Sequence, residues 1–411
     1  MRRRLAAALL AVAAVGCSSA PPPESPRPVP VPAPDTLGRP VEPAPVRVPD
    51  LPRRRPPLAS VRLSFVGDIN LGTITLPDGV PSDSGRTLFD GARQYLAGDL
   101  VVGNFEGVLG DSGTTYKCGK EGKRFPETAD TAAPERPRAP LPRRPTAPRT
   151  CYAFLTPTHL APTLVTAGFT HLNLANNHAN DFGPEARART EAIFDSLSLE
   201  HYGPLGRISI DTVRHGDSMT TVSLVGFTTY PYAYDLLDIA RSAEVVDSLR
   251  RLTDLVLVTF HGGAEGSRAL HVPAAAESLA SEPRGELRRW ARALIEAGAD
   301  AIVGHGPHVL RGIEFHRDRP IVYSLGNFLT YRGFNLSGPL GITGVLQLEL
   351  AGDGGFRRGR LVPMVQIPQG GPVEDPTGAA LVLVRDLSRE DFGPSAAEVG
   401  PEGEILPPRV P

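Results

Sequence analysis

The sequence predicts an α/β domain, because short apolar runs alternate with longer helical patterns between residue 61 and about residue 350. Five of the apolar runs lead directly into polar residues of the kinds that bind ions or transfer protons. Two of these runs also follow a helical pattern that is closed by a glycine, at Gly168 and Gly298. A glycine just past a helix end adopts the left-handed conformation, so the chain turns straight into the next strand.

The polar residues stand where each predicted strand ends. The strands are residues 61–66, 99–102, 170–174, 255–260 and 301–303, and after them come Gly67-Asp68, Asn104-Phe105-Glu106, Asn176-Asn177-His178, His261-Gly262-Gly263 and His305-Gly306-Pro307-His308. The carboxyl ends of buried strands form the edge of a sheet at which sites of α/β proteins assemble, so we expect these side chains to converge. Taken singly, a Gly-Asp pair is usually a turn, and an Asn-Asn-His stretch is equally well a capped loop. Together, the carboxylates, carboxamide and imidazoles with no thiolate suit Mn, Zn, Fe or Mg rather than a structural zinc site.

Length and charge narrow the class of protein. The chain has 411 residues, enough for one large domain with extensions. Its formal net charge of −2 gives no overall basicity that would point to nucleic acid as a partner. The 43 prolines are about twice the usual share, and they are concentrated in a few segments that separate the chain into parts.

The first part, residues 1–16, is predicted to be a lipoprotein signal peptide. Three arginines at positions 2–4 precede an apolar run over residues 5–15, which is too short to span a membrane as a mature helix. Small residues then lead to Cys17, the predicted lipidation site. The alternative is a plain secretory signal with a free Cys17, and both interpretations export the protein to a place outside the cytoplasm. Residues 17–59 are rich in proline, which predicts a disordered, extended tether that holds the domain off a bacterial membrane.

A basic insertion over residues 111–151 contains the two remaining cysteines, Cys118 and Cys151. In an oxidising compartment such a pair predicts a disulfide bond, here one that closes a loop rich in lysine, arginine and proline. Two interpretations of the loop stay open. One is a tolerated surface insertion, and the other is a clamp for an anionic polymer.

Six sequence blocks follow one another along the chain: GDINLG (67–72), GNFEGVL (103–109), ANNHANDFG (175–183), HGGAEG (261–266), GHGPHVLRGIE (304–314) and YSLGNFL (323–329). In this order they resemble the CapA family of poly-gamma-glutamate capsule synthesis proteins. That family is similar to calcineurin-like metallophosphatases, which implies a sandwich of two β-sheets flanked by helices, here over residues 60–367. Residues 368–411 are left as a C-terminal tail.

The resemblance implies a role for each matched residue. It makes Asp68 the first metal carboxylate, Glu106 the carboxylate that bridges two ions, and Asn177 a carboxamide ligand. His261 and His305 resemble the imidazole ligands of the second ion, and His308 the last ligand of the first. His178 resembles the residue that protonates a leaving group. Asn327 matches a family block without an assigned role.

Three positions depart from the pattern. Metallophosphatases have histidine where Asn70 stands, which leaves the first ion one imidazole short and favours one ion over two. Restoring it with Asn70→His is expected to raise the metal content towards two ions per chain. Gly262 and Gly266 replace the usual aromatic residues and are expected to open the wall of the pocket.

Three functions remain at this point. The first is a metal-dependent hydrolase or transferase, with one or two divalent ions, acting on a phosphoester or an amide of a cell-surface polymer. The second is a non-catalytic component that binds an anionic or peptidic polymer together with synthase or export proteins. The third is an interaction scaffold with a relict site.

Overall fold

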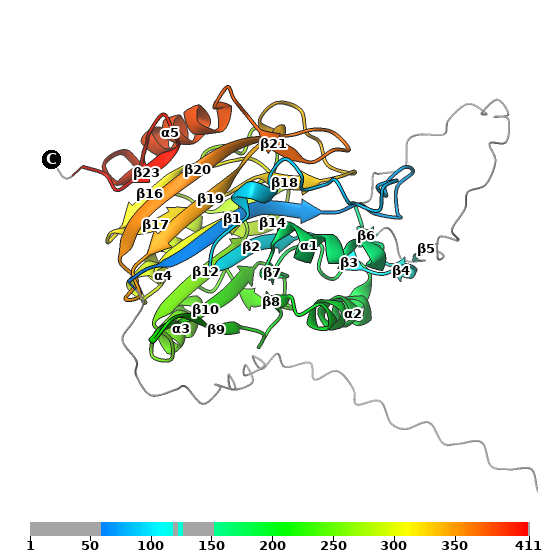
Figure 1. Ribbon diagram of the computed structural model, residues 1–411, viewed down its shortest axis with the longest axis horizontal. Coiled ribbons are helices and arrows are strands. Elements are labelled where there is room, and N and C mark those ends of the chain that lie inside the picture. Colours follow the sequence, from blue (N-terminus) through cyan, green and yellow to red (C-terminus); the bar gives the residue numbers. More distant parts are fainter. Residues whose placement is uncertain (1–58, 118–121, 126–151, 410–411) are drawn as a thin grey trace, which may run out of the picture. The chain divides into compact units, whose positions relative to one another are not determined.

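Two β-sheets form the framework of the described part of the chain, residues 59–117, 122–125 and 152–409 of a computed structural model (Figure 1). The path of the first sheet is β22 (Glu398–Val399), β23 (Glu404–Leu406), β20 (Phe356–Gln366), β19 (Ile342–Leu350), β1 (Val61–Asn70), β2 (Leu100–Phe105), β7 (His171–Asn173) and β8 (Glu200–Tyr202). Off this path, β18 (Asn327–Thr330) pairs with β1 and β21 (Pro372–Glu374) pairs with β20. The second sheet runs β11 (Tyr234–Asp235), β10 (Ser218–Thr228), β12 (Leu255–His261), β15 (Ala301–His305), β17 (Arg319–Val322) and β16 (Ile313–His316), with β9 (Ser209–His215) paired to β10.

The side chains of the central strands contribute to two hydrophobic cores, one between the two sheets and one under the outer helices. In β1, Leu63 and Phe65 belong to the core between the two sheets, whereas Val66 and Ile69 belong to the core under the outer helices. Successive side chains of a strand point to opposite faces, so a strand that is buried on both faces is apolar throughout. This is why the predicted strands are continuous apolar runs rather than alternating ones.

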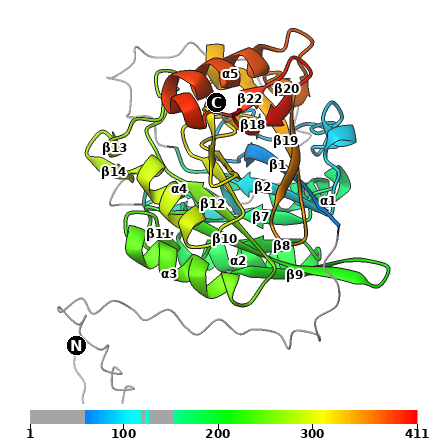
Figure 2. The same cartoon turned by 90° about the vertical axis from the view of Figure 1, so that its left-hand side faces the viewer.

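Helices cover the outer faces of both sheets (Figure 2). Helices α1 (Pro162–Ala167) and α2 (Gly183–Ser196) contribute Leu164 and Phe194 to the core of the first sheet's outer face. Helices α3 (Ile239–Arg250) and α4 (Leu287–Glu296) contribute Val246 and Trp290 to that of the second. The predicted fold class, two β-sheets flanked by helices, is confirmed.

All five predicted strands are present, as β1, β2, β7, β12 and β15. Strands β1, β2 and β7 run parallel, as do β12 and β15, so their carboxyl ends share an edge within each sheet. Both predicted glycine caps are also confirmed, because Gly168 has φ 104° and Gly298 has φ 117°. The strand ends that carry the polar residues are therefore placed as the sequence predicted.

The C-terminal stretch that we predicted to be a tail is part of the fold. It contains β21, α5 (Ala379–Phe392), β22 and β23, and β23 pairs with β20. Leu381 and Val384 of α5 lie in the core between the sheets. The folded unit therefore extends past residue 367, because these short strands and this helix bury apolar side chains that the first sheet leaves uncovered.

Smaller elements surround the edge where the strands end. Strand β3 (Val108–Leu109) pairs with β6 (Leu155–Thr156), β4 (Gly113–Thr115) with β5 (Lys123–Phe125), and β13 (Glu277–Leu279) with β14 (Glu282–Gly285). Short 3₁₀ turns are η1 (Arg93–Tyr95), η2 (Thr158–Leu160), η3 (Gly338–Gly341) and η4 (Gly393–Ser395). Among the described residues, no helix has the length and apolar character needed to cross a membrane. Cys17, Cys118 and Cys151 lie outside the described residues, so lipidation and the disulfide stay predictions.

Candidate metal centre

Asp68, Glu106 and His308 form the centre of the site. His308 Nδ1 lies 3.0 Å from Asp68 Oδ2, and His308 Nε2 lies 3.8 Å from Glu106 Oε1. One ligand atom from each of the three residues lies within 4.8 Å of the others. His305 joins them, with its Nδ1 3.6 Å from Asp68 Oδ1. Residues from β1, β2 and β15 thus meet at the carboxyl edge, as predicted.

The other two predicted ligands lie at the same edge but further from this centre. His261 is the register partner of His305, and its ring centroid is 6.5 Å from that of His308. Asn177 lines the same cavity as His308. The structure therefore groups all six predicted ligands, with Asp68, Glu106 and His308 closest together.

Unpartnered buried atoms are the main chemical feature of this group. Asp68, Glu106, His261 and His305 are all at most 1% exposed. Buried side-chain atoms of the site that have no hydrogen-bond partner are Glu106 Oε1 and Oε2, Asn177 Oδ1, His261 Nδ1 and Nε2, His305 Nδ1 and Asn327 Oδ1. Leaving a polar group buried without a partner costs about 1–3 kcal/mol, and more for a charged group. Such a set of oxygen and imidazole donors fits a divalent cation.

The electrostatics of the centre also favour a cation. Burial, and after it the charge of Asp68, raises the pKa of Glu106 well above its ordinary value. Burial alone would lower the pKa of His308, but Glu106, Asp68 and Glu265 raise it to about 10. Burial works to raise the pKa of Asp68, yet the interactions with the neighbouring imidazoles of His305 and His308 hold it well below its usual range. Two buried carboxylates side by side need positive charge, which protonated His308 supplies in this arrangement.

His178 stands beside the centre with a polarised ring. Its Nδ1 lies 2.7 Å from Asp181 Oδ2, and its Nε2 lies 3.7 Å from Glu106 Oε1. Because a carboxylate only accepts hydrogen bonds, Nδ1 carries the proton of this pair, and Nε2 faces Glu106. Burial lowers the pKa of His178, and the negative charge of Asp181 opposes that shift.

A chain of hydrogen-bonded carboxamides holds Asp68 and the loop that carries His178. Asn104 Nδ2 donates to Asp68 Oδ1 at 2.8 Å, and Asn176 Nδ2 donates to Asn104 Oδ1 at 3.1 Å. The backbone N–H of His178 in turn donates to Asn176 Oδ1 at 3.0 Å. These bonds tie the ends of β1 and β2 to the loop after β7, and so hold Asp68 and His178 in fixed orientations.

Asn327 supports His308, one of the predicted ligands. Its Nδ2 donates to the carbonyl of His308 at 3.3 Å and to that of Leu340 at 3.1 Å. His308 has φ 62°, a left-handed conformation that is strained for a residue other than glycine. The side chain whose role could not be assigned from sequence therefore helps to hold this strained backbone in place.

Asn70 has a structural task that the sequence did not reveal. Its Nδ2 donates to the backbone carbonyl of Glu106 at 2.8 Å, and its Oδ1 accepts from the N–H of Gly72 at 3.1 Å. Both ends of this buried carboxamide are committed to the backbone. The interpretation of position 70 as a vacant ligand position therefore needs revision, because a histidine there would break both bonds.

A cavity of about 950 Å³ opens onto the centre. His178, His308 and Asn177 form part of its lining, together with an aromatic wall in which Phe154 and Phe334 stack at 4.9 Å. The prediction that two glycines open the wall is correct at Gly266, where a Cβ would meet no atom within 4 Å. It is wrong at Gly262, where Leu236 Cδ1 at 3.0 Å and the Arg284 carbonyl oxygen at 3.1 Å already fill the space.

Several residues around the centre and its cavity were not predicted from the sequence. Asp181 stands three positions after His178 in a block that was noted, so the spacing itself was the available signal. Glu265 contacts the buried Arg284, and its Oε2 lies 3.9 Å from His308 Nε2. Lys117, from the basic insertion, lies 2.6 Å from Asp181. No local pattern connects Arg284 or Lys117 with the metal residues, because their proximity arises only in the folded chain.

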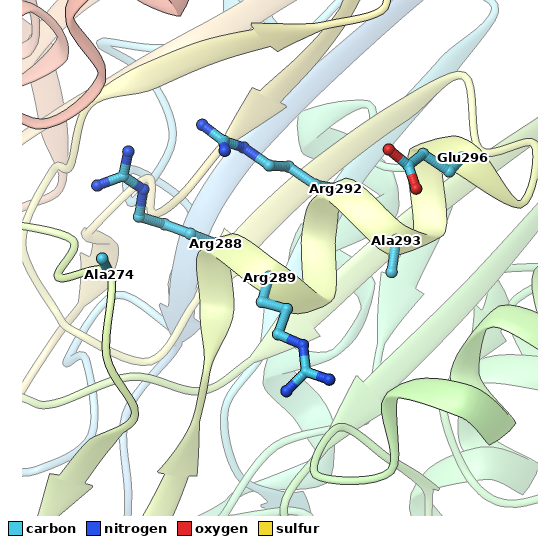
Figure 3. Close-up of a pocket in the computed structure, with 6 residues that line it drawn as sticks. All are labelled: Ala274, Arg288, Arg289, Arg292, Ala293 and Glu296. Atoms are coloured by element: carbon cyan, nitrogen blue, oxygen red, sulfur yellow. The ribbon is translucent and has the colours of Figure 1, made fainter.

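A second hollow lies on the surface of α4 and lacks the features of a metal centre (Figure 3). It is lined by Arg288, Arg289 and Arg292 together with Glu296. Arg292 is paired with Glu314, Arg289 with Glu286, and Arg288 lies 5.1 Å from the ring centroid of Phe392. Its arginines are thus already engaged with neighbouring groups.

Fold and site together define a class: a two-sheet α/β protein with a buried carboxylate and imidazole centre at the carboxyl edge of its strands. The family model "Bacterial capsule synthesis protein PGA_cap" matches residues 140–332. The chain is 31% identical over 186 residues to the capsule biosynthesis protein CapA of Bacillus anthracis, covering 41% of this chain and 42% of that protein. It is also 31% identical over 183 residues to the PGA biosynthesis protein CapA of Bacillus subtilis strain 168, covering 40% and 44%. Over these stretches the chain resembles the CapA family of bacterial capsule synthesis proteins.

These matches are partial, since each aligned stretch spans less than half of the Bacillus relative. Among solved structures, a 5'-nucleotidase precursor from Thermus thermophilus aligns with a TM-score of 0.38 at 14% identity, over 80% of this chain and 58% of that one. At this level of similarity, the description of the site rests on the residues of this chain alone.

Proposed function

We propose that the carboxyl edge of the sheets is the divalent-metal centre of a hydrolase or transferase that acts on a capsule-type polymer at the cell surface. The observation that carries the proposal is the group of buried, unpartnered donor atoms on Glu106, His261 and His305 around Asp68 and His308. Buried polar atoms usually have partners, and a bound cation would supply one for several of these atoms at once. Mn, Zn, Fe and Mg all fit this donor set.

Each residue has a distinct task in this proposal. Asp68, Glu106, Asn177, His261, His305 and His308 hold one or two ions. An ion held there supplies Lewis-acid chemistry, making water nucleophilic near neutral pH and polarising the oxygen of the scissile bond. In its doubly protonated form, His178 donates the proton on Nε2 to the leaving group, while Asp181 fixes the orientation of the ring through Nδ1.

The polymer is inferred from the family. The names of the Bacillus relatives refer to capsule and PGA biosynthesis, and the cavity of about 950 Å³ has room for a short segment of a polymer. We infer that the substrate is an anionic or peptidic polymer such as poly-gamma-glutamate, and that synthase or export proteins are partners. The proposal also includes export and a lipid anchor at Cys17, so that the activity takes place outside the cytoplasm. Intact mass of the membrane-extracted protein tests the anchor: a mature chain that begins elsewhere without a diacylglycerol refutes it.

A non-catalytic role in polymer binding or scaffolding is the second candidate. It is favoured by the basic insertion, which suits an anionic polymer whether or not a bond is cleaved. A metal-loaded protein that binds γ-linked glutamate oligomers but leaves them intact would support this role over catalysis.

The test of the proposed activity compares wild type with His178→Ala and with Asp181→Asn on γ-linked glutamate oligomers and on an aryl phosphate. Turnover that requires added metal and falls in both variants, with metal content unchanged, supports the assignment. Turnover that survives in metal-free protein would contradict it. His201→Ala is a matched control, because His201 is also buried but lies on β8 with Glu191 and Asp195 as neighbours.

A further inference from the structure

We propose that Lys117 is a substrate-binding residue of this site, which receives an anionic group next to the leaving atom of the substrate. This inference rests on the proposed function, since it assigns a substrate feature to the same cavity. Lys117 follows β4 at the base of the basic insertion and lines the cavity. Its side chain is 38% exposed, so it faces solvent while it contacts the buried acid of the His178 pair.

The contacts of Lys117 show how its ammonium group is placed. Nζ lies 2.6 Å from Asp181 Oδ1 and 3.3 Å from the carbonyl oxygen of Asn177. It also lies 3.2 Å from His178 Nδ1, but that nitrogen already donates its proton to Asp181 and cannot accept. An ammonium group has three N–H donors, and two of them are used by these oxygens. The third is available to a ligand in the cavity.

The position of Lys117 does not depend on the charge pair alone. Thr115 Oγ1 donates to the backbone carbonyl of Asp181 at 2.6 Å and ties β4 to the loop that carries His178. Asp181 Oδ2 also accepts the N–H of Phe154 at 2.8 Å. Replacing the ammonium group therefore leaves the backbone connection and the orientation of Asp181 in place, so a loss of binding can be attributed to the side chain.

The location selects the chemistry of the ligand. An anion bound by Lys117 lies beside the Nδ1 edge of the His178 ring, one ring width from Nε2, the atom that donates the proton to the leaving group. In a γ-linked glutamate polymer, the leaving amine carries a carboxylate on the adjacent carbon, so an anionic group stands two bonds from the leaving nitrogen. A phosphate on the leaving group offers the same chemistry. The shared feature is an oxyanion within a few bonds of the leaving atom.

Binding of two probes to the metal-loaded full chain tests the inference: a γ-linked glutamate tetramer and inorganic phosphate. Lys117→Met should weaken the probe that binds wild type by about 10–100-fold, as expected for loss of a charge-assisted hydrogen bond, and Lys117→Arg should restore most of it. Lys123→Met is the matched control, because Lys123 is exposed on β5 and contacts Phe125. It should change binding less than about twofold, as is usual for an exposed charge. The probe that responds identifies carboxylate or phosphate as the source.

Two results would overturn the inference. One is that neither probe binds the metal-loaded wild type, and the other is that the Lys117 and Lys123 variants bind alike. Metal content is measured on the same samples. A metal-free wild type that takes up no ion contradicts the proposed metal centre, whereas a metal-loaded protein whose binding is independent of Lys117 contradicts only this inference.

Discussion

Glu106→Gln should be more stable than wild type in metal-free protein and should gain less stability than wild type when metal binds. Glu106 is fully buried, both of its oxygens lack partners, and burial together with Asp68 raises its pKa well above the ordinary value. In metal-free protein the charged form is therefore unfavourable. Glutamine would be equally unpartnered but uncharged, so it should stabilise the fold by about 1–3 kcal/mol, the order of the extra cost that charge adds to an unsatisfied buried group. Metal at a hundred times its Kd stabilises wild type by about 2.7 kcal/mol, and Glu106→Gln should lose most of that gain.

The stability difference between Glu106→Gln and wild type in metal-free protein should depend on pH. A carboxyl whose folded pKa is raised destabilises the fold once pH exceeds its unfolded pKa, and the penalty grows as pH rises towards the folded pKa. The advantage of Glu106→Gln in metal-free protein should therefore vanish below about pH 4 and grow towards neutrality. Protonated His308 offsets part of the penalty, because its pKa of about 10 keeps it charged over this range.

Denaturant unfolding with chelator and with added Mn or Zn measures both effects, at pH 4 and pH 7. Glu200→Gln, which neutralises an exposed carboxylate on β8, is the control and should leave stability unchanged in both states. Destabilisation of the metal-free protein by Glu106→Gln at pH 7, or equal stabilisation of wild type and variant by metal, would contradict this prediction.

Three further predictions follow from the site. Metal binding should displace the proton of His308, so metal affinity should rise with pH up to about 10. Calorimetry in buffers of different ionisation enthalpy should detect proton release at about pH 8, and no release would contradict the role of His308 as a ligand. His178→Ala should keep its metal and lose about 10²–10⁴-fold in turnover, and a variant that loses metal instead would show that His178 is a ligand. Asn70→His should lower the free energy of unfolding by about 1–3 kcal/mol, because the hydrogen bonds of Asn70 to Glu106 and Gly72 are lost, and it should not add an ion. Denaturant unfolding and elemental analysis measure the two effects. A second ion per chain would instead support the interpretation of position 70 as a ligand position.

The sequence predicts those site residues that directly follow an apolar strand. Asp68, Glu106, His261 and His305 each lie at the end of an apolar strand, so the direction of the chain alone places them at one edge. The layers were also predictable, because strands that are apolar on both faces require helices outside and a second sheet inside.

The remainder depends on contacts between distant segments. Lys117 reaches Asp181 from an insertion whose sequence indicates only charge and irregularity. Asn70 differs from the expected histidine, and only the structure shows that its carboxamide holds the Glu106 backbone. Strands β22 and β23 are too short to show a period, and only the pairing of β23 with β20 and of β22 with β23 defines them as strands. Local patterns carry no information about which distant partner completes a hydrogen bond.

Metal content per chain is the most direct test of the central claim. Elemental analysis of the purified full chain, before and after titration with Mn, Zn, Fe and Mg, should find at least one tightly held ion in wild type. Glu106→Gln should hold markedly less, and Glu200→Gln should match wild type. A wild-type protein that purifies without metal and takes up none of these ions would contradict the account, and the polymer-binding role would then replace it.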